Sequence, residues 1–404
     1  MSQLRKCTRC GLPETYETIE FDADGVCNIC NGHSYRDEKI DWDARRKMLD
    51  DLVEEYRGKH DYDCIVPFSG GKDSTYTLWY LVTQFKLKPL VVQFNHGFMR
   101  ERLKQNNEQT FKRLGVDVLS FTPNWRVVKR LMLEALRRKG DFCWHCHTGI
   151  FSYPMHVAVK FQVPLVFWGE PSAEYTQYYD YRDDEIEEVD ETRFNRFVNL
   201  GITAEDMHGM IKEDFDLDPR DLAPYTYPKL RDLNRLGYRS VCLGSFIKWD
   251  VKKQFAIIRD ELGWQGDQVE GMPWEEYPYE KIECYMQGMR DYIKFVKRGY
   301  SRVSQMTAID LRNGRITPEH ARHLVETYEG KKPRSLDIFL DYLGLTVEEF
   351  NDIVGQTVIP PHEPDFAANE WSEKPWDYDN WYREPPEHRG VDFRVIDTSR
   401  LTRK

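Results

Sequence analysis

The sequence has no long hydrophobic run and no apolar N-terminal segment. Its longest apolar stretches, such as residues 164–168 (PLVFW), are far too short to span a bilayer. The first six residues, MSQLRK, contain no apolar core of the kind that a secretory signal requires. We therefore expect a cytoplasmic protein without membrane insertion.

The chain also lacks an excess of positive charge. Lys and Arg number 57 while Asp and Glu number 68, so the net charge is −11 at pH 7. An acidic balance disfavours binding to a phosphate backbone, and we expect no nucleic-acid partner. In a cytoplasmic chain, the nine cysteines are expected to be metal ligands, reactive thiols or core residues rather than disulfides.

A glycine-rich hexapeptide follows the short apolar run at residues 64–68 and precedes a helical pattern. Glycines in such a turn let backbone N–H groups surround a phosphate, and the N-terminus of the helix adds partial positive charge. The lysine neutralises further charge, the serines supply hydroxyls, and the aspartate can hold or orient Mg²⁺. The phosphate-binding residues expected here are Ser69, Gly70, Gly71, Lys72, Asp73 and Ser74.

This hexapeptide is not the ordinary P-loop, in which Ser or Thr follows the lysine, because Asp73 stands at that position. The string Ser-Gly-Gly-x-Asp-Ser after a strand resembles the PP-loop of ATP pyrophosphatases. That resemblance implies binding of the β and γ phosphates of ATP, release of pyrophosphate, and transfer of AMP to a substrate oxygen. Lys72 and Asp73 are the expected catalytic residues.

From residue 61 onward, short apolar runs alternate with helical patterns. This alternation predicts an α/β fold with a doubly wound, mainly parallel sheet of the PP-loop, or adenine nucleotide alpha hydrolase-like, type. Ligands of such sheets bind beyond the carboxyl ends of the strands. At those ends we expect Asn95, His96, Gly169 and Glu170 to complete the ATP site. The expected strands are residues 64–68, 90–94, 118–121, 165–168 and 240–243.

Two Cys-x-x-Cys pairs lie near the N-terminus, Cys7 with Cys10 and Cys27 with Cys30. Four thiolates at this spacing predict a tetrahedral zinc site in a zinc ribbon. Such a closed site leaves no open position for a substrate, so its role is expected to be structural. The alternative is four unrelated free cysteines.

A third pair, Cys143 and Cys146, lies in the segment CWHCH with His145 and His147. Cys242, at the end of a predicted strand, is a candidate third thiolate. The segment could therefore hold a second metal or an iron–sulfur cluster. It could instead be a substrate-side loop in which a histidine acts as acid or base, or a purely structural turn.

These patterns divide the chain into five parts. The fourth part contains a clear helix start, where the N-cap Thr317 is followed by Pro318. The expected parts are a zinc ribbon at 1–35, a linking helix at 36–60, a PP-loop domain at 61–265, a helical C-terminal domain at 266–354, and an extended Pro- and Trp-rich arm at 355–404.

A further distinctive segment runs from Gly299 to Thr317, with the sequence GYSRVSQMTAIDLRNGRIT. Together with the PP-loop and the cysteine pairs, it resembles the N-acetyl sugar amidotransferases of bacterial lipopolysaccharide O-antigen or flagellar glycan biosynthesis. The resemblance covers residues 7 to about 333 and implies substrate contacts by Tyr300, Arg302 and Arg312. The run departs from the family pattern at Gln305, Met306 and Pro318, so the sugar need not be that of the best-studied members.

The resemblance implies that an N-acetyl group on a sugar or nucleotide sugar becomes an acetamidino group. The acetamido oxygen attacks the α-phosphorus of ATP, giving an O-adenylyl imidate and pyrophosphate. Ammonia then adds to the imidate carbon and AMP leaves. Positioning and charge neutralisation dominate such catalysis, and the implied cofactors are ATP, Mg²⁺ and Zn²⁺.

The sequence has no glutaminase nucleophile of the N-terminal type, because position 2 is Ser2, and no Gly-x-Cys-x-Gly elbow. We therefore expect no glutaminase activity in this chain. The resemblance implies that a separate glutaminase, with a barrel subunit like that of imidazole glycerol phosphate synthase, supplies the ammonia.

The main alternative is a tRNA thiolation enzyme of the PP-loop class. In that interpretation Cys143, Cys146 and Cys242 hold an iron–sulfur cluster that passes sulfur to an adenylated base. The net negative charge and the acidic stretch at residues 178–191 disfavour tRNA as a substrate. The run at 299–317 favours the sugar.

Overall fold

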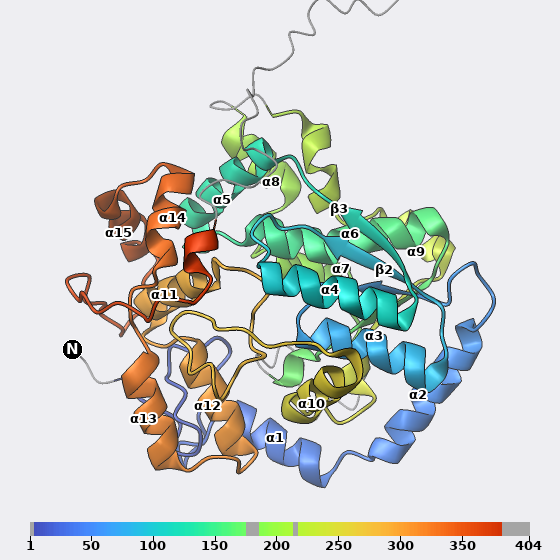
Figure 1. The fold of residues 1–404 in the computed structure, drawn as a ribbon, viewed down its shortest axis with the longest axis horizontal. Helices are drawn as coiled ribbons and strands as arrows, with labels where there is room; N and C mark the ends of the chain where they lie inside the picture. The colour runs from blue at the N-terminus through green and yellow to red at the C-terminus, as the bar shows by residue number, and fades with distance from the viewer. Residues whose placement is uncertain (1–3, 175–185, 213–216, 382–404) are drawn as a thin grey trace, which may run out of the picture.

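The computed structural model describes residues 4–174, 186–212 and 217–381 (Figure 1). Its centre is a five-stranded parallel sheet with strand order β3-β2-β1-β4-β5. This order confirms the predicted doubly wound fold, and each strand lies within one or two residues of its predicted position. The strands are β1 Cys64–Pro67, β2 Pro89–Phe94, β3 Asp117–Phe121, β4 Leu165–Trp168 and β5 Arg239–Cys242.

Alternate side chains of the strands enter two different cores, one on each face of the sheet. Val66 and Phe167 pack with α3 and α10, whereas Ile65 and Val166 pack with α6 and α9. Helices therefore cover both faces, as parallel sheets require. The helices of this domain are α3 Lys72–Phe85, α4 Glu101–Leu114, α5 Trp125–Lys139, α6 Trp144–Phe161, α7 Glu191–Arg193, α8 Ala204–Ile211, α9 Leu230–Leu236 and α10 Val251–Leu262.

The segment predicted as a linking helix, residues 36–60, contains helix α2, which spans Trp42–Tyr56. A separate helix, α1, spans Asn28–Glu38 and begins within the predicted zinc ribbon. The break falls at Asp41, whose carboxylate accepts hydrogen bonds from the backbone N–H groups of Asp43 (3.1 Å) and Ala44 (2.9 Å). This N-cap starts α2 anew and accounts for the interruption.

The C-terminal region is helical only from residue 287. Residues 266–286, predicted to belong to a helical domain, contain no helix, because Pro273 and Pro278 lack the backbone N–H that a helix interior needs. The expected helix start is confirmed, since Thr317 caps α13 and accepts a hydrogen bond from the N–H of His320 (3.2 Å). The helices are α11 Gln287–Arg298, α12 Arg302–Arg312, α13 Pro318–Tyr328, α14 Ser335–Leu343 and α15 Val347–Gly355.

The described part of the C-terminal arm, up to residue 381, lies against the body of the protein. The Asp377 carboxylate is 2.8 Å from the Arg100 guanidinium, and the Trp381 ring stacks on Tyr285.

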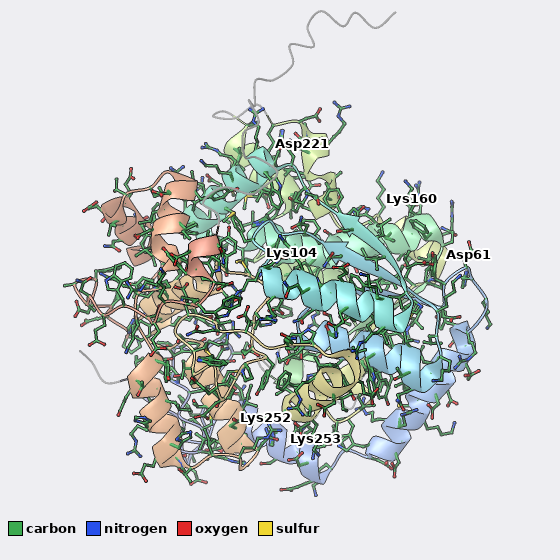
Figure 2. All side chains as sticks on the ribbon, in the orientation of Figure 1. Asp61, Lys104, Lys160, Asp221, Lys252 and Lys253 are labelled. Atoms are coloured by element: carbon green, nitrogen blue, oxygen red, sulfur yellow. The ribbon has the colours of Figure 1, made fainter. Side chains whose placement is uncertain are left out.

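Charged side chains such as Asp61 and Lys160 project at the surface (Figure 2). Within the described residues, no helix is long and apolar enough to cross a membrane. Residues 178–185 of the acidic stretch lie outside the described residues.

Candidate functional site

The PP-loop (residues 69–74) is the turn between β1 and α3. Gly70 has a φ of +88°, a left-handed conformation that favours glycine. Its N–H donates to the Ser74 hydroxyl (3.1 Å), and the N–H of Gly71 donates to the Ser69 hydroxyl (3.3 Å). Helix α3 begins at Lys72, so the loop lies at a helix N-terminus, where anions are favoured.

Two side chains from distant segments lie directly over the glycines of the loop. A Cβ atom added at Gly70 would collide with the Asn107 amide, and one added at Gly71 would collide with the Glu283 carboxylate. The Oδ1 atom of Asn107 is buried and has no hydrogen-bond partner among the described residues. Sequence reasoning missed both residues, because neither belongs to a motif.

Lys72 is held by an acidic residue from the C-terminal region. Its Nζ atom is 2.9 Å from Oδ2 of Asp73 and 2.8 Å from Oε2 of Glu280, and the Lys72 side chain is only 2% exposed. Oε1 of Glu280 is 3.4 Å from the Arg302 guanidinium, which also contacts Asp291 at 3.3 Å. This Lys72–Glu280–Arg302 network therefore joins the PP-loop to the run at 299–317.

The charge of this network determines the protonation state of Glu280. Burial raises the pKa of that carboxyl, but the positive charges of Lys72 and Arg302 outweigh burial and lower it to about 2. Glu280 is thus ionised at neutral pH and neutralises two buried cations. The structure places Arg302, predicted as a substrate contact, within this ion network.

Asp73, in the first turn of α3, and Glu170, just after β4, form a pair of carboxylates. Gly169 permits the close approach, because a Cβ there would lie 3.1 Å from the backbone oxygen of Asp73. Oδ1 of Asp73 and Oε1 of Glu170 are both buried without a hydrogen-bond partner among the described residues. Burial, and then the charge of Asp73, raises the pKa of Glu170 well above its usual value. Two unsatisfied carboxylate oxygens fit a divalent cation.

Asn95 and His96 lie where predicted, directly after β2. The Asn95 side chain accepts a hydrogen bond from the N–H of Gly97 (3.0 Å) and donates one to the Thr122 hydroxyl (3.3 Å). Burial, and then the neighbouring His145, lowers the pKa of His96 to about 4. Burial lowers the pKa of His145 to about 4 as well, so both rings are neutral at pH 7. Their contact with ATP stays a prediction.

The structure does not bring Cys242 to the Cys143–Cys146 pair, and that part of the predicted metal site is wrong. Cys242 ends β5 and packs in the core beneath α6 and α9, whereas Cys143 borders a different core under α11 and α14. Within the described residues, the one group of three or more metal-ligating side chains with mutually close donor atoms is the N-terminal four-cysteine cluster.

Cys284 is half-buried, packs against the core under α11 and α14, and lies near Cys146. Burial, and then the charge of Cys284, raises the pKa of Cys146, so this thiol stays protonated. Burial, and then Arg290, lowers the pKa of His147 to about 3. His147 is therefore neutral at pH 7 and only a weak base.

The four N-terminal cysteines converge. Sγ of Cys7 is 3.9 Å from Sγ of Cys30, and Sγ of Cys10 is 3.7 Å from Sγ of Cys27; all four lie within 4.8 Å of one another. The second pair lies at the start of α1, where Cys27 is the N-cap. The arrangement can hold a metal ion.

The cysteine cluster packs on α12 through two residues that were predicted to contact substrate. Tyr300 is 1% exposed, its hydroxyl donates to the Glu17 carboxylate, and its ring centroid lies 5.1 Å from that of Tyr16. Burial lowers the pKa of the Arg312 guanidinium, but the nearby Cys10 and Cys30 raise it overall. The structure thus places both residues in the interface with the N-terminal module, and their role toward substrate stays a prediction.

Comparisons with known proteins identify the C-terminal region most clearly. Residues 274–381 match the family described as "LPS biosynthesis protein WbpG-like, C-terminal domain". The chain is 26% identical over 145 residues to the uncharacterized protein MJ1599 of Methanocaldococcus jannaschii. That match covers 35% of this chain and 50% of the relative, so the chain spans about half the length of the curated relative it matches.

One solved structure shows low sequence identity and low structural similarity to this chain. It is the U34-tRNA thiolase NcsA from Methanococcus maripaludis with its [4Fe-4S] cluster, which is 13% identical with a TM-score of 0.32. The alignment covers 81% of this chain and 88% of that chain.

Proposed function

We propose that this chain is an ATP-dependent amidotransferase of lipopolysaccharide biosynthesis. Its substrate is the N-acetyl group of a sugar or nucleotide sugar, which it converts to an acetamidino group. The match of residues 274–381 to the WbpG-like C-terminal domain supports this proposal. The observation that carries the proposal is the buried Lys72–Glu280–Arg302 network. Its ion pairs join the phosphate-binding loop to the region that matches the WbpG-like C-terminal domain.

In the first step, the acetamido oxygen attacks the α-phosphorus of ATP. The bond from that phosphorus to the bridging oxygen of the β-phosphate breaks, and pyrophosphate leaves. The PP-loop N–H groups, the N-terminus of α3 and Lys72 stabilise the leaving pyrophosphate. In the second step, ammonia adds to the imidate carbon and loses a proton, and the bond from carbon to the AMP oxygen breaks. The products are AMP and a cationic acetamidino sugar.

Asp73 and Glu170 are the residues that would hold Mg²⁺. When bound, the ion neutralises phosphate charge and orients the polyphosphate. The unpartnered oxygens of the two carboxylates support this assignment. Ion binding would also relieve the repulsion that raises the pKa of Glu170.

For the N-terminal cluster we propose structural zinc. Zinc–sulfur bonds of about 2.3 Å in a tetrahedron place the sulfurs roughly 3.8 Å apart. The sulfur separations of 3.9 Å and 3.7 Å agree with that geometry. A four-iron cluster needs wider spacing, because each thiolate binds a different iron atom.

Ammonia, in this proposal, comes from a separate glutaminase with an imidazole glycerol phosphate synthase-like barrel subunit, in the cytoplasm. A free ammonium salt would then replace those partners in vitro. The activity of the chain can therefore be assayed without those partners.

The experiment is pyrophosphate release in the presence of ATP, Mg²⁺, ammonium chloride and a panel of UDP-N-acetyl hexosamines. Asp73→Asn removes the charge that would hold Mg²⁺, and we expect the rate to fall by about 100-fold or more. The matched control is Asp61→Asn at the exposed Asp61, which should release pyrophosphate like the wild type. Pyrophosphate release at the wild-type rate by the Asp73 variant would show that Asp73 does not hold the metal ion.

A further inference from the structure

A short segment of the C-terminal region, from Glu280 to Glu283, lies against the PP-loop. Oε2 of Glu280 is 2.8 Å from Nζ of Lys72, and the Glu283 carboxylate lies over the second glycine of the loop. Ile282 is fully buried in the core that it shares with β1 and α3. These three contacts fix the segment beside the loop. The remaining residue of the segment is Lys281, a half-buried lysine that takes part in none of them.

The backbone of Lys281 is strained. Its φ is +52°, in the left-handed region that favours glycine. Residues with long side chains rarely adopt this conformation, because the Cβ atom crowds the backbone. Strain of this kind persists only where the surrounding contacts impose it, and it concentrates at functional sites. A lysine at a position suited to glycine therefore indicates that the ammonium group has a function.

The charge of Lys281 acts on groups at the ends of two different elements. Burial, and then Asp73, raise the pKa of Glu170, which follows β4, and the positive charge of Lys281 opposes this increase. Burial, and then Arg290, lower the pKa of His147, and Lys281 contributes to that decrease. The ammonium group thus lies near both the carboxylate pair and the start of α6.

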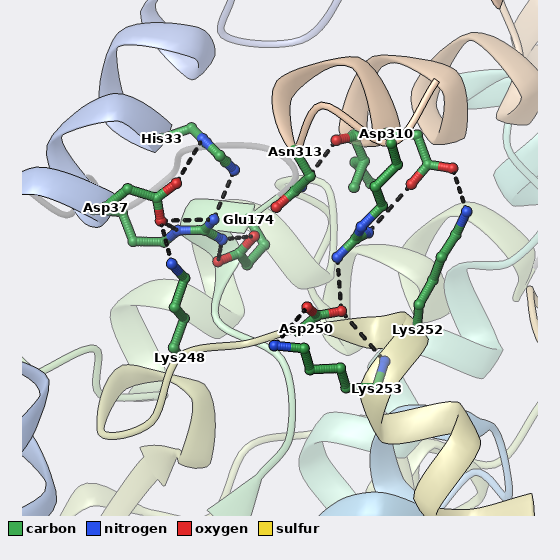
Figure 3. A network of polar contacts seen from close by, with 12 residues as sticks. His33, Asp37, Glu174, Lys248, Asp250, Lys252, Lys253, Asp310 and Asn313 are labelled. Carbon is green, nitrogen blue, oxygen red and sulfur yellow. Dashed lines mark hydrogen bonds and ion pairs between the residues drawn. The ribbon is translucent and has the colours of Figure 1, made fainter. Parts of the chain in front are cut away.

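The Lys281 ammonium makes no ion pair or hydrogen bond within the described residues. The lysines at and just before the start of α10 differ in this respect. Nζ of Lys252 is 2.6 Å from the Asp310 carboxylate (Figure 3). Nζ of Lys248 is 2.8 Å from the Asp37 carboxylate in the same view. A phosphate oxygen binds best to a cation that has no other partner, and Lys281 meets that condition beside the PP-loop.

We propose that the ammonium group of Lys281 binds the α-phosphate of ATP. This inference rests on the proposed function only in that ATP is the substrate. The PP-loop holds the β- and γ-phosphates, so the α-phosphate lies at the edge of the loop, which the segment from Glu280 to Glu283 borders. The ammonium group stabilises the charge on the non-bridging α-phosphate oxygens while the acetamido oxygen attacks. It stays with the AMP group when pyrophosphate leaves.

Isothermal titration calorimetry tests this assignment with Mg²⁺-ATP, AMP and Mg²⁺-pyrophosphate as separate probes. The variant is Lys281→Gly, which removes the ammonium group and supplies the residue that a positive φ favours. We expect ATP and AMP to bind about tenfold or more weakly than to the wild type, while the affinity for pyrophosphate stays unchanged. The melting temperature should stay the same or rise, because the backbone strain is relieved.

Two further variants complete the experiment. Lys281→Arg keeps the positive charge and should retain most of the affinity for ATP. The matched control is Lys248→Met, at a lysine that already has a carboxylate partner, and it should bind all three probes like the wild type. Lys281→Asn repeats the test if the glycine variant is unstable, because asparagine also tolerates a positive φ.

Unchanged affinities for ATP and AMP in the Lys281→Gly variant would overturn the assignment. An equal loss of affinity for pyrophosphate would also overturn it, since the ammonium group would then act at the other end of the triphosphate. Failure of the proposed function would look different: the three probes would bind as predicted, yet no acceptor sugar would be modified.

Discussion

At the scale of single residues, Glu280 compensates the buried charge of the PP-loop lysine. Its carboxylate is fully buried between Lys72 and Arg302. Glu280→Gln would leave two buried cations short of a counter-charge, and we expect a loss on the order of 3 kcal/mol in the free energy of unfolding. Urea denaturation measures this loss, with Glu101→Gln, at an exposed glutamate, as control. Equal stability of the two variants would contradict the role of Glu280.

The pH dependence of this residue has a defined sign. Because the folded-state pKa of Glu280, about 2, lies below its ordinary value of 4.5, the stability it contributes is present above pH 4.5. That contribution is lost as the pH falls from 4.5 toward 2.

The buried histidines add an acid sensitivity at higher pH. Burial lowers the pKa of His145 from 6.5 to about 4, so the unfolded chain binds a proton there before the folded one does. Stability should therefore decline as the pH falls from 6.5 to 4, by about 2 kcal/mol for this residue between pH 7 and pH 5. His145→Gln should remove that part of the decline in urea titrations at the two pH values. His60→Gln, at an exposed histidine, should show the same loss of stability between the two pH values as the wild type. An equal loss of stability in both variants would contradict this role of His145.

The sequence predicted the PP-loop residues but not the groups that surround them. Lys72 and Asp73 are in a local motif, whereas Glu280, Glu283 and Asn107 reach the loop from distant segments. A buried lysine demands a carboxylate partner, yet its identity depends on tertiary packing. Nothing in the local pattern around residue 280 marks it.

At the scale of elements, the N-terminal cysteine module packs on α12, and its four thiols are arranged so that they could hold a metal ion. Cys10→Ser removes one of four converging thiolates, and we expect metal content and thermal stability to fall together. Elemental analysis and thermal denaturation measure the two effects. Cys143→Ser, which changes a thiol outside the cluster, should leave the metal content at the wild-type level. An unchanged melting temperature and an unchanged zinc content in the Cys10 variant would show that the four cysteines do not form a metal site.

The elements themselves could be predicted where periodicity is strong. The five strands followed from short apolar runs, because strands buried on both faces lack polar positions. Residues 266–286 belong to the region predicted to be helical, but they form no helix. In the structure, Tyr277 and Ile282 of this segment enter the same core as β1 and α3 without forming a helix. Its prolines fix an irregular path, and that path carries Glu280 and Glu283 to the PP-loop.

At the scale of the whole molecule, the candidate site arises only when the sheet domain and the C-terminal region pack together. The sheet domain supplies the phosphate loop and the Asp73–Glu170 pair, and the C-terminal region supplies Glu280 and Arg302. Sequence alone identified both halves, but the contact between them depends on long-range packing. The N-terminal module packs on α12 through a shared core that includes Ala308.

The central claim is that this chain exchanges the oxygen of an acetamido group for nitrogen at the expense of ATP. The most direct test is mass spectrometry of the acceptor after incubation of the purified protein with ATP, Mg²⁺, ammonium chloride and UDP-N-acetyl hexosamines. The account predicts a product in which NH replaces the acetamido oxygen, with AMP and pyrophosphate formed in equal amounts. AMP formation that leaves every sugar unchanged, while tRNA gains sulfur in a parallel reaction supplied with tRNA and sulfide, would contradict it.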